Sequence, residues 1–156
     1  MVSIYKPHGS LDWTVVNGTT IRSGFPIGPD RCLIITPGQN KYRAGYDQPF
    51  DMQRELANKA LDEAQRFFVI GYGFNDDHLE THLSTKITSG SPTVIIARSL
   101  TPNARSLLSD HPNLMALESD PNDATSTLIH FRGATLPLGG QQLWDVERFS
   151  IGVMGA

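Results

Sequence analysis

The sequence predicts an α/β fold in which helices cover both faces of a parallel sheet, giving three layers. Residues 67–70, 93–97 and 114–118 are short, continuous apolar segments, which is typical of strands buried on both faces. Helical patterns occupy the intervals between them, at residues 77–88 and 101–109. The resulting order β-α-β-α-β is typical of a parallel sheet, because parallel strands need a crossover connection.

Composition excludes several functional classes. The chain has 156 residues, 39% of them hydrophobic, which suits one globular domain. No apolar segment approaches the roughly 20 residues that span a bilayer, and the N-terminus has no secretory pattern, so we expect a soluble, cytoplasmic protein without membrane contact. The net charge of −3, without a basic block, argues against direct nucleic-acid binding. The single Cys32 excludes an internal disulfide and a multi-cysteine zinc site within one chain.

The N-terminal half predicts short strands and one long helix. Residues 12–16 and 19–22 are β-rich segments separated by Asn17 and Gly18, a strong hairpin signal. Apolar residues recur at four-residue spacing in residues 51–66, which predicts a helix. We also expect a strand at residues 3–6, a buried strand at residues 32–36 and a polar break at residues 8–10. Loops are expected at residues 24–30 and 40–49.

The C-terminal part has weaker patterns. The expectations are a loop at residues 120–124, weak periodicity at residues 126–132 and a Gly/Pro linker at residues 137–142. Residues 143–149 predict an amphipathic tail whose Trp144 and Phe149 dock on the body. We therefore expect one partial α/β domain at residues 1–142 and a packed tail at residues 143–156.

A glycine turn follows the first of the three buried strands. Gly71 and Gly73 break the strand, and Asn75, Asp76 and Asp77 suit the start of a helix. In an open α/β sheet this junction lies where ligands bind. The acidic residues would repel a phosphate at this helix end but not an uncharged ribose. The alternative is a turn that serves backbone geometry alone.

Other polar residues stand at strand ends. His8 lies beside a glycine and has the pKa range of a general base, although a surface histidine in a turn is the alternative. Arg98 and Ser99 close the strand after the glycine turn, where dinucleotide folds bind the adenosine ribose; an exposed strand-end arginine is the alternative. His78 and His82 share one helix face, but no third ligand is evident, so we expect no metal.

Three stretches together resemble a known family. Residues 6–13 read KPHGSLDW, residues 68–79 read FVIGYGFNDDHL, and residues 143–149 read LWDVERF. They are similar to the second half of the bacterial sirtuin-like domain, a Rossmann-like relative of the NAD-dependent deacetylases. Many members of this group are NAD-cleaving effectors of anti-phage defence. The resemblance covers nearly the whole chain.

The resemblance implies a function and a set of site residues. NAD would be the substrate, and cleavage of its nicotinamide–ribose bond would make the protein an NAD glycohydrolase. His8, the histidine of the family's H-G-S motif, would be the catalytic base. The cofactor-binding residues implied in this way are Gly9, Ser10, Gly71, Tyr72, Gly73, Asn75, Arg98 and Ser99.

The chain also departs from the family pattern. The glycine-rich phosphate loop and the asparagine–aspartate segment of the family precede the H-G-S motif, with which this chain nearly begins. We therefore expect an incomplete fold, from a truncated, split or remnant domain, that forms a homo-oligomer or binds a partner chain supplying the N-terminal half. The cysteine zinc module of the deacetylases is also absent, which argues against deacetylation. The alternative is a non-catalytic nucleotide-binding or assembly module, or a remnant that is inactive on its own.

Overall fold

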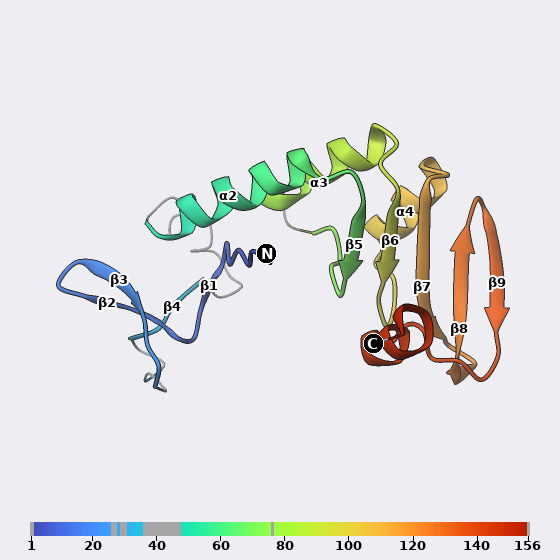
Figure 1. The fold of residues 1–156 in the computed structure, drawn as a ribbon. Helices are drawn as coiled ribbons and strands as arrows, with labels where there is room; N and C mark the ends of the chain where they lie inside the picture. The colour runs from blue at the N-terminus through green and yellow to red at the C-terminus, as the bar shows by residue number, and fades with distance from the viewer. Residues whose placement is uncertain (1, 26–27, 29–30, 36–47, 76, 156) are drawn as a thin grey trace. The chain divides into compact units, whose positions relative to one another are not determined.

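The computed structural model describes residues 2–25, 28, 31–35, 48–75 and 77–155 (Figure 1). The chain divides into two compact units, Met1–Leu61 and Asp62–Ala156, and each is treated separately below. Across these described residues, every helix is too short or too polar to cross a membrane. The expected division of the chain at residue 142 stays a prediction.

The first unit is built from two small antiparallel ribbons. Strands β2 (Trp13–Val16) and β3 (Thr19–Arg22) pair with Val16 opposite Thr19. Asn17 and Gly18 have φ values of 50° and 77°, and two positive φ values are what a type I′ turn requires. The hairpin predicted from the Asn-Gly pair is therefore confirmed.

Other expectations for the first unit are wrong. Residues 3–6 form no strand; instead Gly9–Ser10, expected as a polar break, forms β1 and pairs with β4 (Leu33–Ile34). The segment at residues 32–36 is thus a two-residue strand among the described residues, and Ile34 is 41% exposed rather than buried. A two-stranded ribbon has no second layer to cover such a residue. Most of the expected loop at residues 40–49 lies outside the described residues.

Helix α2 (Phe50–Glu63) is the long helix expected at residues 51–66. It begins one residue earlier because the buried Phe50 belongs to its first turn. It ends three residues earlier than expected because Arg66 directly precedes a strand and the chain must leave the helix before extending.

The second unit contains a five-stranded mixed sheet with the order β5-β6-β7-β8-β9. Strands β5, β6 and β7 run parallel and are connected through helices, whereas β8 pairs antiparallel with β7 and β9 pairs antiparallel with β8 (Figure 1). The predicted β-α-β-α-β segment is therefore confirmed. The elements are β5 (Phe67–Ile70), α3 (Asp77–Thr88), β6 (Thr93–Ile96), α4 (Pro102–Asp110), β7 (Leu114–Asp120), β8 (Asp123–Phe131) and β9 (Ala134–Leu138).

The antiparallel half of the sheet was not expected. Within the predicted loop at residues 120–124 only residues 121–122 form a turn, and the others belong to β7 and β8. The weakly periodic residues 126–132 lie mainly in β8. The predicted linker at residues 137–142 begins inside β9. Pro137 favoured a linker in the prediction, but proline is tolerated on an edge strand, and β9 is an edge strand. The protein is thus mixed α/β with helices flanking a partly parallel sheet.

The C-terminal segment packs on this sheet. Phe149, at the end of α5 (Val146–Phe149), forms a buried cluster with Ile96 and Leu117. Its ring centroid lies 5.1 Å from that of Phe68. The predicted docking of the tail through Phe149 is confirmed, and Trp144 is half-buried. The chain continues into a short π-helix, η2 (Ser150–Met154).

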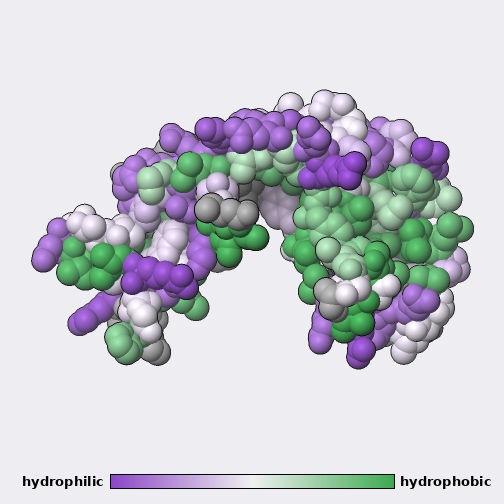
Figure 2. Space-filling model, viewed as in Figure 1, coloured by the Kyte–Doolittle hydropathy of each residue, from purple (hydrophilic) through white to green (hydrophobic). Residues whose placement is uncertain are grey.

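Strand β5 is less buried than expected. Val69 is buried, but Phe68 is 45% and Ile70 is 50% exposed, because β5 is the first strand of the sheet order and pairs with β6 alone. The prediction of a strand buried on both faces is therefore wrong for β5 and right for β6. Apolar surface also gathers around the C-terminal helices, where Ile151 and Met154 are exposed (Figure 2).

Candidate functional site

A cleft of about 830 Å³ lies in the second unit where the parallel strands end. The turn after β5, the residues closing β6 and the end of β7 contribute to it, and β8 and the first turns of α4 complete its walls. The carboxyl ends of parallel strands are where open α/β sheets bind ligands. Five of the residues predicted from the sequence line this one cleft: Gly71, Tyr72, Gly73, Arg98 and Ser99.

The glycine turn has an unusual backbone. Gly71 has a φ of 64°, and its N–H donates to the Ile96 carbonyl at 2.9 Å, which extends the pairing of β5 with β6. Phe74 has a φ of 55°, a left-handed conformation that costs a non-glycine residue about 1–2 kcal/mol. Its ring is fully buried and lies 5.0 Å from the Tyr72 ring, so packing holds the backbone in this conformation.

Helix α4 fixes the turn from the other side. The Thr101 hydroxyl donates to the Gly73 carbonyl at 2.6 Å and also accepts from the Ala104 N–H as the N-cap of α4. Proline at the first helical position follows it, as the sequence predicted. The turn and the start of α4 therefore form one hydrogen-bonded wall of the cleft.

Asn75 supports this wall rather than lining the cleft. The Asn103 side-chain amide donates to the Phe74 carbonyl at 2.7 Å and to the Asn75 Oδ1 at 3.0 Å. A methyl group on Gly73 would lie 2.8 Å from the Asn75 Nδ2 atom and 3.0 Å from the Thr101 Cγ2 atom, so these side chains would have to shift. The prediction that Asn75 contacts the cofactor stays a prediction.

Sequence reasoning missed a charged cluster in the same cleft. Glu118 is 3% exposed and accepts from the Leu100 N–H at 2.9 Å, from Arg105 Nη2 at 2.9 Å and from His130 Nε2 at 2.8 Å. A buried carboxylate needs such partners to offset its lost hydration. The one available signal was a charged residue closing a buried strand, because Arg105 and His130 are distant in sequence and share no pattern with it.

The residues of the H-G-S motif belong to the first unit. His8 is exposed, and its carbonyl accepts from the Ile35 N–H at 2.9 Å. Gly9 has a φ of 79°, and a methyl group on it would lie 2.1 Å from the Leu33 carbonyl oxygen and 2.7 Å from the Phe50 ring. Packing alone therefore requires glycine at this position.

Ser10 takes part in a polar network. Its hydroxyl donates to the Asp12 carboxylate and accepts from Lys6 Nζ at 2.6 Å. The hydrogen bond from Ser10, followed by that from Arg22, holds the pKa of Asp12 well below its usual range. Ser10 thus has a structural role in the first unit, whereas the predicted cleft residues lie in the second.

No group of three metal-ligating side chains occurs in the part of the chain that the structure describes. His82, one member of the histidine pair, instead lies 2.9 Å from the Asp62 carboxylate. The chain matches neither a model of a known protein family nor a curated protein. The motifs and the geometry of the cleft are therefore the indications of function in this chain.

Proposed function

We propose that the chain is the nucleotide-binding part of a sirtuin-like domain that binds NAD and cleaves its nicotinamide–ribose bond. The observation that carries this proposal is the gathering of Gly71, Tyr72, Gly73, Arg98 and Ser99 in one cleft at the carboxyl end of parallel strands. These residues come from two sequence segments: the glycine turn belongs to a motif, and Arg98 and Ser99 close the next strand. A volume of about 830 Å³ suits a ligand of this size.

The chemistry of the cleft matches the parts of a dinucleotide. The glycine turn offers backbone at close range, which suits an uncharged ribose. Arg98 is exposed at the end of β6 and supplies positive charge for a phosphate or an adenosine hydroxyl. The first turn of α4 carries no acidic residue, and the Glu118 carboxylate beside the start of this helix is paired with Arg105.

In the proposed reaction, water and NAD give nicotinamide, ADP-ribose and a proton. The bond from the ribose carbon to nicotinamide breaks with its electron pair leaving on nicotinamide, and the water oxygen bonds to the cationic ribose carbon. His8 would accept the proton from that water or from a ribose hydroxyl. A defence function would follow from depletion of NAD in the infected cell.

The binding part of the proposal is tested by titrating NAD into the full chain in a calorimeter. Arg98→Ala should weaken binding by roughly tenfold, the factor that corresponds to about 1.4 kcal/mol. Arg66→Ala is the matched control, because it removes the same charge just before β5, at the end of that strand opposite the glycine turn. Absence of NAD binding by the folded chain, or equal loss in both variants, would contradict the proposal.

The catalytic part is tested by nicotinamide release, measured for the chain alone and with any chain encoded directly upstream. His8→Ala should abolish release and leave NAD binding intact. His111→Ala, at the C-cap of α4, is the control and should change neither. Release that persists in His8→Ala would exclude His8 as the base.

A second candidate is a non-catalytic nucleotide-binding module. It is favoured by one observation, that all the described residues lining the cleft belong to the second unit. This candidate predicts NAD binding that depends on Arg98, without nicotinamide release and without any effect of His8→Ala.

We also propose that the protein works as an oligomer or with a partner chain. Strand β5 supports this proposal, because it exposes Phe68 and Ile70 along an edge of the sheet. Sedimentation should detect an assembly that Ile70→Lys dissociates, whereas Thr88→Lys, on the exposed end of α3, should leave it unchanged. A monomeric wild-type chain at all concentrations would contradict the proposal.

A further inference from the structure

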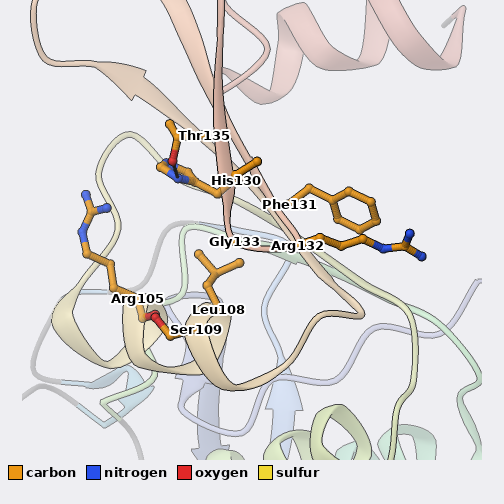
Figure 3. Close-up of a pocket in the computed structure, with 9 residues that line it drawn as sticks. Arg105, Leu108, Ser109, His130, Phe131, Arg132, Gly133 and Thr135 are labelled. Atoms are coloured by element: carbon orange, nitrogen blue, oxygen red, sulfur yellow. Dashed lines mark hydrogen bonds between the residues drawn. The ribbon is translucent and has the colours of Figure 1, made fainter.

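A second recess, of about 260 Å³, lies between helix α4 and the hairpin formed by β8 and β9 (Figure 3). His130 of β8 and Thr135 of β9 line it together with Arg105 and Ser109 of α4. His130 and Thr135 are partners in the antiparallel register of the two strands. Figure 3 shows the His130 ring and the Thr135 hydroxyl against each other on the strand side of the recess.

A hydroxyl, an imidazole and a carboxylate are joined in one chain of hydrogen bonds. Thr135 Oγ1 lies 2.9 Å from His130 Nδ1, and His130 Nε2 lies 2.8 Å from Glu118 Oε1. Thr135 is exposed, His130 is half-buried and Glu118 is buried. The three groups therefore run from the recess into the protein interior. This is the order nucleophile, base and orienting acid that activates hydroxyls in enzymes.

The direction of these hydrogen bonds follows from the chemistry of the groups. A carboxylate only accepts, so His130 Nε2 must carry the proton in its contact with Glu118. In the neutral imidazole Nδ1 is then the acceptor, and the Thr135 hydroxyl must donate to it. In serine proteases Nε2 accepts the proton of the nucleophile and Nδ1 donates to the carboxylate, whereas here Nδ1 faces the nucleophile and Nε2 donates to the carboxylate.

Glu118 is held rigidly enough to orient the imidazole. Its Oε2 accepts from the Leu100 N–H at 2.9 Å, and both of its oxygens lie 2.9 Å from Arg105 Nη2. Because Arg105 and His130 share the Oε1 atom, the guanidinium and the imidazole are neighbours. The carboxylate thus fixes the base and places a cation beside it.

We propose that Thr135, His130 and Glu118 form a hydrolytic site for small carboxylic esters, with Thr135 as the nucleophile and His130 as the general base. Arg105, Glu118 and His130 also line the cleft proposed for NAD, but the chemistry of this site requires no NAD. The volume of the recess limits the acyl part to a small group. Arg105 is the cation beside the imidazole, whereas Arg132 points away along the Phe131 ring, at 5.0 Å from its centroid.

The proposed reaction has two balanced halves. Thr135 Oγ1 bonds to the ester carbonyl carbon while its proton passes to His130 Nδ1; the bond to the leaving alcohol then breaks, and the alcohol takes that proton. A water molecule next gives its proton to Nδ1, and its oxygen bonds to the acyl carbon. The bond to Thr135 Oγ1 breaks, the hydroxyl recovers the proton, and a carboxylic acid is released.

The test uses p-nitrophenyl acetate with the full chain. The wild-type protein should release nitrophenolate and carry an acetyl group on Thr135, detected by rapid quenching and peptide mass spectrometry. Thr135→Val keeps the shape of an exposed edge-strand residue and should lose the adduct. His130→Gln keeps hydrogen-bonding capacity but accepts no proton, and should slow acylation by about 10²-fold or more.

Thr125→Val is the matched control. It removes a threonine hydroxyl from the exposed start of β8, outside the recess, and that hydroxyl donates to the Asp123 carboxylate rather than to an imidazole. Acylation should be unchanged in this variant. Circular dichroism establishes that each variant is folded. The proposal is overturned if the folded wild-type chain forms no adduct at Thr135, or if Thr135→Val or His130→Gln reacts as fast as the wild type.

Discussion

The two glycine turns that the sequence analysis predicted to contact NAD differ in what surrounds their glycines. In the first unit, a methyl group on Gly9 would collide with the Leu33 carbonyl at 2.1 Å, and the Ser10 hydroxyl is bound by Asp12 and Lys6. In the second unit, a methyl group on Gly71 would meet nothing within 4 Å, and the turn opens into a cleft. Both glycines have a positive φ, of 79° and 64°, but only Gly9 is also required by packing.

A glycine at a motif position is therefore a weaker indication of a ligand site at Gly9 than at Gly71. Gly9 is fully explained by the close approach of β1 to β4 and Phe50. Gly71 leaves space, and Thr101 fixes the neighbouring backbone through a 2.6 Å hydrogen bond to Gly73. A structurally fixed turn that leaves open space is the more direct indication of a ligand site.

The largest effect is expected for Gly9→Ala. Left-handed strain and overpacking against backbone together should lower the free energy of unfolding by about 3 kcal/mol. The measurement is urea unfolding followed by Trp13 fluorescence in a Trp144→Phe background. Gly18→Ala is the control, because its φ of 77° is nearly the same but its surroundings are open, so it should cost only about 1 kcal/mol. Equal costs would contradict the packing explanation.

Thr101→Val should have the next largest effect. It removes the hydroxyl that donates to the Gly73 carbonyl and caps α4, so thermal unfolding of the second unit should show a loss of about 1–2 kcal/mol. NAD binding should weaken as well, because the turn loses its tie to the helix. Thr88→Val, whose exposed hydroxyl donates to the Thr85 carbonyl at the end of α3, should change neither quantity.

Comparing Gly71→Ala with Gly90→Ala should distinguish a loss of stability from a loss of NAD binding. The positive φ predicts a loss of about 1 kcal/mol in the free energy of unfolding, and a similar loss is expected for Gly90→Ala, whose φ is 95°. Both positions are open, but Gly71 alone lines the cleft. Calorimetric titration should therefore show weaker NAD binding in Gly71→Ala only. Binding unaffected by both changes would place NAD away from this turn.

The smallest effect is expected for Ser10→Ala. In the folded protein the pKa of Asp12 is lowered, first by the hydrogen bond from Ser10, so Asp12 stabilises the fold above its unfolded pKa of about 4 and this stabilisation is lost as the pH falls. Ser10→Ala should move the pKa of Asp12 back upward and reduce that loss. NMR titration of the carboxyl carbons measures the pKa of Asp12 in the wild type and the variant. Asp123, whose pKa is lowered by hydrogen bonds from Ser126 and Thr125, is the unchanged reference.

Local patterns were sufficient for part of the fold. The Asn17–Gly18 pair predicted the hairpin, and the Thr-Pro start of α4 predicted its cap, because each signal acts over a few neighbouring residues. The antiparallel strands β8 and β9 were missed. Their exposed faces carry polar residues and threonines without a strong apolar alternation, and β9 contains Pro137.

The candidate sites divide in the same way. The glycine turn and Arg98 were found from the sequence because each stands directly after an apolar strand, and parallel strands bring their ends to one edge. The cluster of Glu118, Arg105 and His130 was not found, because antiparallel pairing of β8 brings His130 beside β7 and no local pattern encodes that contact.

The sequence by itself determined the parallel strands, their connecting helices and the turn beside which the cleft forms, because periodicity and turn chemistry are local properties. The tertiary structure alone decided which polar groups meet. It placed a buried carboxylate between a guanidinium and an imidazole, and it paired that imidazole with the Thr135 hydroxyl across two strands. Such contacts depend on strand register and on burial. Burial raises the free-energy cost of an unpaired charge, so the arrangement in which these charges are paired is the stable one.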